Sequence, residues 1–518
     1  MNKKDNTNRM HRVTVINIDR SHPLFDYCDS VSALANNLYN VSLYHIRQVF
    51  SGVRKDPENR FQNEIEVLKA IEETLPKMQA RNKKFKMPTE KRPTLSYQFL
   101  DAFLKFSNNP DYYAEGLPAH ARQYSIRNAS SDIWNFFSAI RKYKKDPSSF
   151  LGRPKIPRYR DKGGHCTFTM SNQECHYVNG DNGHRYLKLP LLDELLLEIP
   201  KDLQGTLSEV KVTPYYDIYR VSIITDIGEK PSLKEEKPTR IIAIDLGVSN
   251  FAAITNNIGA PCLLFKGGVL KSVNQWYNKR MSIIVSEQTK GTTKKFAPTP
   301  ESKALCMDRD NKMRDFMHKT ANYIISWCET NKIDTIVIGE NKGWKQDSDM
   351  NRFCNQEFVG LPFNMFKAFL EYRAVAIGIR VVRQEESYTS RASFLNKDPI
   401  PVFGEDGADK VKFSGTRGPS TYRGNHRPNN GSIRGIYKIK GEKKYINSDL
   451  NGSANILRKA FPHAFDDGIE PNFNDVVIIV HPDYASMIAL KKRQCEKNAN
   501  KEMSKAKKKR LAKKTAIS

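Results

Sequence analysis

Residues 241–255 of the chain are IIAIDLGVSNFAAIT, and this stretch decides the fold class. Its first six residues form an apolar run that is typical of a strand buried on both faces. Asp245 interrupts that run. A lone carboxylate is costly to bury unless it is paired or binds a cation, which makes Asp245 the first candidate functional residue.

Further elements can be placed on both sides of this strand. FAAIT and PCLLF complete a three-strand meander, and the spacing of apolar residues predicts a long helix over 302–330. A buried strand (333–340), a helix (362–378), a strand (379–384) and a final helix (451–461) follow. This β-β-β-α-β-α-β-α order is, by analogy, that of an RNase H-like domain in an α/β multidomain protein.

Two further carboxylates stand in comparable positions. Glu340 ends the apolar strand IDTIVIGE, and Asp449 stands just ahead of a helix in NSDLNGSANIL. Helix capping is the competing explanation for Asp449. In an RNase H-like arrangement the first and fourth strands are neighbours and the last helix packs beside them. Asp245, Glu340 and Asp449 would then meet at one end of the sheet.

Three converging carboxylates repel one another unless cations offset their charge. Mg²⁺ prefers carboxylate oxygens together with water and phosphate oxygens. Two such ions about 4 Å apart can activate a water and stabilise the leaving oxygen of a phosphodiester. The constellation therefore predicts metal-dependent cleavage of nucleic acid.

Composition supports a polyanionic partner. The 518 residues include 84 Lys and Arg against 57 Asp and Glu, a net charge of +27. The pI of about 9.6 favours nucleic-acid binding over acidic small substrates. The eight cysteines include no C-x-x-C pair, which predicts a reducing, cytoplasmic compartment. The N-terminus is polar, and no apolar run reaches the roughly 18 residues that span a bilayer. We therefore expect a soluble protein without membrane contact.

The first half of the chain divides by pattern. We expect a strand over 11–19, an amphipathic helix over 30–50, mainly helix over 51–145 and mainly strand over 165–240. The aromatic residues Trp134, Phe136 and Phe137 fit packing between helices, with base stacking as the alternative.

A basic strip, FLGRPKIPRYRDK, connects the helical and strand-rich parts at 150–162. Its two prolines prevent a regular helix, so an extended strip presents its charges to a phosphate backbone. The alternative is a solvated basic linker. The candidate nucleic-acid contacts here are Arg153, Lys155, Arg158, Tyr159 and Arg160.

Several motifs of the sequence resemble those of a known family. IAIDLGVSNFAAIT, IVIGENKGWKQ and NSDLNGSANILRK are similar to the three RuvC motifs of TnpB proteins, transposon-encoded ancestors of small type V CRISPR effectors. NQEFVGLPFNMFKAFLEYRAVAIGIRV, EESYTS, FLGRPKIPRYRDK and SALANNLYNVSLYHIRQVF also match, so that the resemblance covers most of residues 11–461.

The resemblance implies an RNA-guided DNA endonuclease with a single RuvC site. A guide RNA pairs with target double-stranded DNA, and the protein reads a short flanking motif. Carried over by motif, Asp245, Glu340 and Asp449 hold two Mg²⁺ ions, for which Mn²⁺ can substitute. Lys342 and Arg434 are further candidate nucleic-acid contacts. The expected location is prokaryotic cytoplasm, at the nucleoid when DNA is bound.

The resemblance also implies five parts of the chain. They are a β-rich wedge domain (1–50 and 146–235), an inserted helical recognition domain (51–145), a RuvC nuclease domain (241–390 and 448–470), an insertion (391–447) and a basic tail (471–518). The tail residues 491–518 hold twelve Lys and Arg against two Glu, a net charge of +10, which favours disorder.

The chain departs from the family in the insertion. Many members carry a four-cysteine zinc ribbon after YTS, whereas no cysteine occurs here from 355 to 494. Zinc is therefore not expected there. A second zinc pattern, His165-Cys166 with Cys175-His176, is disfavoured because adjacent strand residues point to opposite faces. Without zinc, the insertion is either a basic guide for substrate or a flexible surface loop.

Other functions stay open at this level. A small type V CRISPR effector, or an intermediate between the two groups, would use a CRISPR RNA in place of a transposon-derived omega RNA. A catalytically silent RNA-guided repressor would bind without cutting, and the presence of all three acids weighs against it. A strand-joining transposase also uses an RNase H-like triad. The oligomeric state is not predicted.

Overall fold

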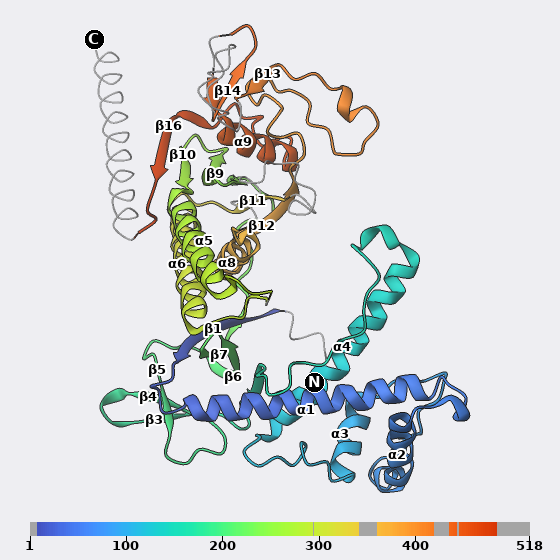
Figure 1. Ribbon diagram of the computed structural model, residues 1–518. Helices are drawn as coiled ribbons and strands as arrows, with labels where there is room; N and C mark the ends of the chain where they lie inside the picture. The colour runs from blue at the N-terminus through green and yellow to red at the C-terminus, as the bar shows by residue number, and fades with distance from the viewer. Residues whose placement is uncertain (1–7, 294, 341–359, 419–434, 443–444, 484–518) are drawn as a thin grey trace, which may run out of the picture. The chain divides into compact units, whose positions relative to one another are not determined.

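The structure is a computed structural model, drawn in Figure 1, that describes residues 8–293, 295–340, 360–418, 435–442 and 445–483. The chain divides into two compact units, Met1–Glu229 and Lys230–Ser518. Each unit has its own hydrophobic core, and we describe each by itself.

The first unit contains two antiparallel sheets. Its larger sheet has the order β1-β7-β6-β2, so that the first strand pairs with one more than 200 residues later. The bounds are β1 (Arg9–Ile18), β2 (Phe168–Ser171), β6 (Thr206–Tyr215) and β7 (Ile218–Glu229). The smaller sheet holds β3 (His176–Asn179), β4 (Arg185–Lys188) and β5 (Leu196–Ile199).

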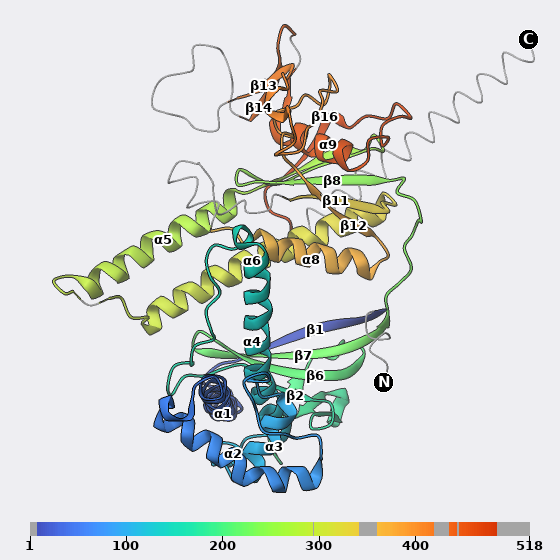
Figure 2. The same cartoon turned by 90° about the vertical axis from the view of Figure 1, so that its right-hand side faces the viewer.

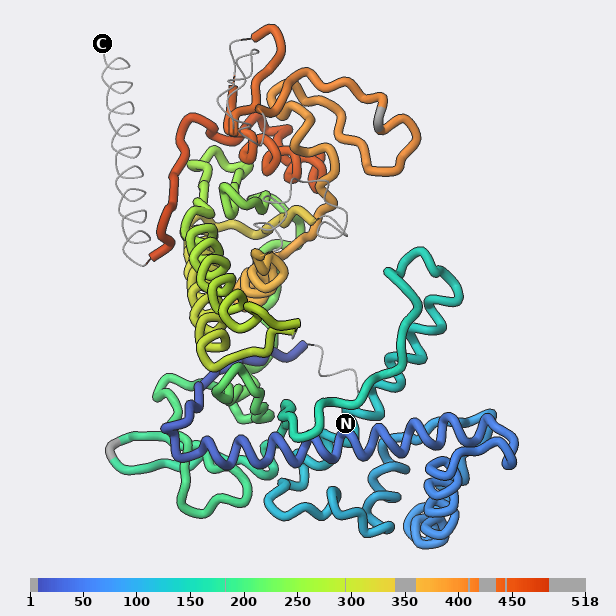
Figure 3. The backbone as a smooth tube through the Cα atoms, viewed as in Figure 1, coloured from blue at the N-terminus to red at the C-terminus, as the bar shows by residue number. Residues whose placement is uncertain are grey.

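The first unit also contains helices, and Figure 3 traces the long first helix in blue. They are α1 (Phe25–Gly52), α2 (Gln62–Arg81), α3 (Tyr97–Phe106) and α4 (Ala119–Lys145), with short 3-10 turns η2 (Pro57–Asn59), η3 (Pro147–Ser149) and η4 (Asp181–Gly183). Tyr39 of α1 donates a hydrogen bond to Asp132 of α4 (2.7 Å), which ties the two long helices together. The predicted strand over 11–19 and helix over 30–50 are confirmed.

The second unit is built on a six-stranded sheet with the order β12-β11-β8-β9-β10-β16. Its strands are β8 (Ile241–Leu246), β9 (Asn250–Asn256), β10 (Pro261–Lys266), β11 (Thr335–Glu340), β12 (Arg380–Glu385) and β16 (Asn472–Ile479). The expectation that the first and fourth strands are neighbours is confirmed, because β8 and β11 pair in parallel.

One boundary differs from the sequence analysis. The region 471–518 was expected to be a basic tail throughout, but β16 joins the sheet in parallel beside β10. Ile479 of this strand lies in the core. The sequence NFNDVVII ends in the β-branched residues that favour such a strand. The cluster of basic residues from Lys491 onward lies outside the described residues.

Helices cover both faces of this sheet (Figure 2). On one face lie α5 (Gly268–Thr289), α6 (Pro300–Thr330) and α8 (Phe363–Ala376), and on the other lies α9 (Ser448–Ala460). The sequence analysis expected the last three of these helices, whereas α5 was not anticipated. Side chains of β8 alternate: Ile242 and Ile244 belong to the core with α6 and α8, and Ile241 and Ala243 to the core with α9.

The insertion contains a small antiparallel sheet of β13 (Gly415–Arg417), β14 (Ile436–Ile439) and β15 (Tyr445–Asn447), with a 3-10 turn η5 (Ala408–Lys410) before it. The Tyr437 hydroxyl is buried and donates to the Arg391 carbonyl (2.7 Å), which anchors this sheet. Asn447 is both the last residue of β15 and the N-cap of α9, so the sheet leads directly into the helix.

Among the residues that the structure describes, none of the helices combines the length and the apolar character that a bilayer span requires.

Candidate active site

Asp245 points toward α9. It alternates with Ile241 and Ala243, whose side chains pack on that helix. Burial raises the pKa of Asp245 well above its usual value, and the neighbouring charges of Glu386 and Asp449 raise it further, whereas Arg417 opposes the shift. A carboxyl group in such surroundings gains from any cation that can approach it.

Asp449 lies in the first turn of α9, and both of its carboxylate oxygens are engaged. Arg417 donates to Oδ1 (2.6 Å) and Asn250 donates to Oδ2 (2.7 Å). Lys266 in turn donates to the Asn250 side-chain oxygen (2.8 Å) and fixes the orientation of that amide. Asn447 provides the helix cap by accepting from the backbone N–H of Asp449, so capping does not explain Asp449.

Gly452 permits Asp245 to approach α9 closely. A Cβ atom built on Gly452 would lie 2.5 Å from Asp245 Oδ2, a contact that side chains do not make. Ser453, the next residue, donates to the Ala243 carbonyl (2.8 Å), and its oxygen accepts from the Thr255 backbone N–H (3.1 Å). These buried contacts hold Gly452 against the strand that carries Asp245.

The opposite side of α9 holds the segment that follows β12. Asn451 and Asn455 are fully buried, and both donate to the Ala392 carbonyl, at 2.8 and 2.7 Å. Asn451 also accepts from the Phe394 backbone N–H (3.0 Å). The polar pattern NGSAN is therefore explained, since each of these side chains satisfies buried backbone groups on one side of the helix or the other.

Glu340 lies on a different side of the sheet from Asp245. Parallel register pairs Ile242 with Ile336 and Ile244 with Ile338, so alternation places Glu340 with the core of α6 and α8. There it accepts from Lys367 of α8 (3.4 Å) and from Arg383 of β12 (3.1 Å). Both cations hold its carboxylate at the end of β11.

Glu386 is a further acidic residue at the site, and the sequence analysis did not single it out. It follows β12 directly, and its Oε2 would lie 2.1 Å from a Cβ atom on Gly339, the residue before Glu340. Its pKa is raised to about 7, mainly by burial, with Lys367 opposing the shift and the charges of Glu385 and Glu340 adding to it. Since Glu386 also raises the pKa of Asp245, it links the Asp245 and Glu340 sides electrostatically.

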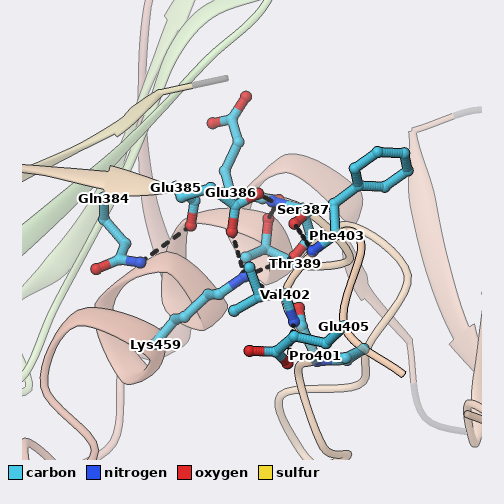
Figure 4. A network of polar contacts seen from close by, with 10 residues as sticks. All are labelled: Gln384, Glu385, Glu386, Ser387, Thr389, Pro401, Val402, Phe403, Glu405 and Lys459. Carbon is cyan, nitrogen blue, oxygen red and sulfur yellow. Dashed lines mark hydrogen bonds and ion pairs between the residues drawn. The ribbon is translucent and has the colours of Figure 1, made fainter. Parts of the chain in front are cut away.

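Figure 4 shows that the Glu386 carboxylate points away from the polar network beside it. In that network Lys459 of α9 pairs with Glu385 (2.6 Å) and donates to the carbonyls of Ser387 and Pro401 (both 3.1 Å). Lys459 thereby fixes the backbone on both sides of Glu386. The EESYTS motif was the available signal for Glu386, but its burial depends on the fold around it.

The donor chemistry fits Mg²⁺ or Mn²⁺, since several carboxylates repel one another here and cationic side chains stand in as counter-ions. Within the described parts of the chain, however, no three His, Cys, Asp or Glu side chains are grouped closely enough to hold a metal. Asp245, Asp449 and Glu386 lie near one another, and Glu340 is held aside by Lys367 and Arg383. All of these carboxylates can bind the same ions only if Lys367 and Arg383 release Glu340.

The basic strip lies in the first unit. Arg153, Lys155, Arg158 and Tyr159 are exposed there. Arg160 differs from them, because its guanidinium lies 3.5 Å from the centre of the Tyr39 ring. The candidate contacts Lys342 and Arg434 lie outside the described residues.

Comparison with protein families adds one match. Residues 219–345 match the family model OrfB_IS605, described as a probable transposase. The matched residues include both Asp245 and Glu340. The resemblance to the TnpB family is confirmed. No curated protein matches this chain in a sequence search.

Solved structures also resemble the chain at low identity. A Cas12f1–sgRNA–target DNA complex is 11% identical over 86% of this chain and 98% of that one, with a TM-score of 0.45. The mini RNA-guided endonuclease CRISPR-Cas_phi3 is 9% identical over 88% and 92%, with a TM-score of 0.38. Alicyclobacillus acidoterrestris C2c1 bound to single-guide RNA is 9% identical over 82% and 70%, with a TM-score of 0.34.

Proposed function

We propose that this chain is an RNA-guided DNA endonuclease with one RuvC-type site in an RNase H-like domain. The observation that carries the proposal is the half-buried Asp245, which lies against Gly452 of α9 and is repelled by the nearby carboxylates of Asp449 and Glu386. Carboxylates this close together repel one another unless cations offset their charge, and such a group is typical of a site that binds cations.

Asp245, Glu340 and Asp449 are the proposed ligands of two Mg²⁺ ions. Bound ions of this kind supply an activated water and neutralise charge on the phosphodiester. The protein's own residues orient this set: Asn250 and Lys266 fix Asp449, and the Ser453 contacts hold α9 against β8. Arg417 and Arg383 are placed to meet phosphate once they release their carboxylates.

The partners proposed are a guide RNA and target double-stranded DNA, with a short flanking motif read by the protein. The net charge of +27 supports binding of polyanions, and base pairing supplies sequence specificity in such systems. Whether the guide is a transposon-derived omega RNA or a CRISPR RNA is decided by sequencing the RNA that co-purifies with the chain. A CRISPR repeat in that RNA would assign the chain to the type V effectors.

Cleavage of a plasmid library tests the proposal. The chain with its co-purified RNA should cut plasmids that carry the guide match and a fixed flanking motif, with Mg²⁺ and not with EDTA. Asp245→Ala and Glu340→Ala should abolish cutting and keep RNA and target binding. Target binding without cutting by the unaltered chain would favour an RNA-guided repressor, and cutting at a normal rate by either variant would refute the site.

The description of the matched family as a probable transposase favours a second candidate, a transposase that joins DNA strands. The same carboxylates would then serve a reaction in which a DNA 3′-hydroxyl, not water, attacks the phosphodiester. Incubation with DNA that carries transposon ends separates the two functions. A nuclease leaves hydrolysed ends, whereas a transposase yields joined strands.

A further inference from the structure

The first unit contains a cavity of about 610 Å³ between α1, α4 and the basic strip. Sites for small ligands commonly enclose roughly 300–1,000 Å³. Its lining residues are Arg47, Phe50, Phe136, Ile140, Arg153, Pro154, Lys155, Ile156 and Arg158. Four of these side chains are basic, and none of the described lining residues is acidic.

The apolar part of the cavity is built on a cluster of phenylalanines. Phe137 of α4 packs against the core of this unit, and its ring centre lies 5.2 Å from those of both Phe50 and Phe136. Phe50 and Phe136 are half-buried, and each contributes to the cavity wall. The cavity wall therefore contains two aromatic rings that Phe137 supports, and the Arg54 guanidinium lies over the Phe50 ring, 4.5 Å from its centre.

The basic part is held in place by side chains of α1. Asn36 donates to the Asp161 carbonyl (3.0 Å) and Asn40 donates to the Arg160 carbonyl (3.1 Å). Asn40 also accepts from the Arg160 backbone N–H (2.8 Å), and Arg47 donates to the Pro157 carbonyl (3.5 Å). Successive positions on one side of α1 thus fix the extended strip before any ligand binds.

Arg47 has a second contact with the strip, since its guanidinium lies 4.8 Å from the centre of the Tyr159 ring. Arg153, Lys155 and Arg158 are exposed at the rim. A flat aromatic ligand that carries a negative charge matches this combination of supported rings and a fixed basic rim. Double-stranded nucleic acid does not, because its bases are stacked and paired.

We propose that this cavity binds a single unpaired nucleotide, with its base against Phe50 and Phe136 and its phosphate at the basic rim. The proposal goes beyond the nuclease site, which lies in the other unit, and it requires neither metal nor cutting. Both an RNA strand and a DNA strand can present such a nucleotide, and the two are separated in the experiment by the sugar of the probe.

The test uses the full chain, freed of co-purifying RNA and kept in EDTA. The probes are short single-stranded RNA and DNA oligonucleotides that carry one 5-iodouracil. Irradiation should join the iodinated base to the peptide that holds Phe136 or the one that holds Phe50. Preference for the RNA probe would assign the site to RNA, and preference for the DNA probe would assign it to a DNA strand.

Measurements of oligonucleotide affinity separate the contribution of base stacking from that of phosphate contacts. Phe136→Ala should weaken oligonucleotide binding by about five-fold or more without changing its salt dependence. Arg158→Gln should instead reduce the salt slope by about 0.7, the contribution of one phosphate contact in a single strand. Trp134→Ala is the matched control, because this side chain is 49% exposed on α4 and does not line the cavity.

Three outcomes would overturn the proposal. They are crosslinks that map only to other peptides, an abasic probe that binds as tightly as the complete one, and equal losses of affinity for Phe136→Ala and Trp134→Ala. Thermal unfolding of each variant shows whether it is folded. If the chain binds the probe as expected but does not cut DNA, the proposed endonuclease fails and this site stands.

Discussion

Gly452 of α9 lies so close to Asp245 of β8 that a Cβ atom on the glycine would come within 2.5 Å of the Asp245 carboxylate. Gly452→Ala should therefore destabilise the second unit by about 1–3 kcal/mol, because the helix or the carboxylate must shift. It should also lower cleavage. Thermal unfolding and plasmid cleavage measure the two effects.

Gly268→Ala is the matched control for that substitution. Gly268 lies at the start of α5, and a Cβ atom there meets nothing within 4 Å. Alanine is at least as compatible with a helix as glycine, so this variant should keep or slightly raise stability. Equal effects of the two substitutions would contradict the close approach of Gly452 to Asp245.

Asp245→Asn should abolish cleavage while the metal-free protein becomes as stable as before or more stable. The amide removes a carboxylate that is repelled by Asp449 and Glu386 and keeps the shape of the side chain. Mg²⁺ at about 100 times its dissociation constant should stabilise the unaltered chain by about 2.7 kcal/mol, and this gain should shrink in the variant. Melting with and without Mg²⁺ gives both results. A full stabilising effect of Mg²⁺ on Asp245→Asn would remove this residue from the ligands.

Arg417→Gln should strengthen binding of divalent ions by the free protein. Arg417 donates to Asp449 at 2.6 Å, so an approaching ion competes with this guanidinium. Titration with Mn²⁺, followed by electron paramagnetic resonance, measures the affinity directly. Lys438→Gln removes the same charge from an exposed position on β14 of the same small sheet and should leave the affinity unchanged.

The stability of the first unit should fall between about pH 6.5 and about pH 4. Burial lowers the pKa of His45 to about 4, and its ring packs edge-on against Phe103 with centres 5.1 Å apart. The folded state thus binds fewer protons than the unfolded state in this range. The contribution of the neutral ring is complete above about pH 6.5 and is lost as pH falls through about 4.

His45→Phe removes this titration and should make stability in that range less dependent on pH, by about 1–3 kcal/mol. Urea unfolding at about pH 7 and about pH 5 measures the change. Hydrogen exchange at α1 assigns the transition to the first unit. Equal pH dependence in the variant and the unaltered chain would show that His45 is not responsible.

Much of the second unit could be predicted because its strands are apolar and its helices are periodic. Asp245 stood out in an apolar strand, and Asp449 near a helix start, so their proximity followed once the order of elements was assigned. Glu386 could not be found in this way. It follows the strand RVVRQE, whose polar residues gave no sign that the next carboxylate is buried.

The face of the sheet on which Glu340 lies was also not anticipated, although the alternation of side chains along a strand would have predicted it. Register between β8 and β11 places Ile338 beside Ile244, which leaves Glu340 and Asp245 on opposite faces. The ends of the strands predict that the carboxylates share one edge of the sheet, but not which face each of them occupies. Lys367 and Arg383, which hold Glu340, come from elements whose contacts depend on the completed fold.

Asn447 ends β15 and caps α9, while Arg417 on β13 of the same small sheet binds Asp449. The insertion is thus joined to the acidic residue twice, once through the backbone and once through a side chain. A molecule that binds the insertion and shifts its small sheet would therefore move Asp449 without contacting Asp449 itself. Replacing this insertion with that of a related protein should consequently change the affinity of the site for metal ions, even when every acidic residue is kept.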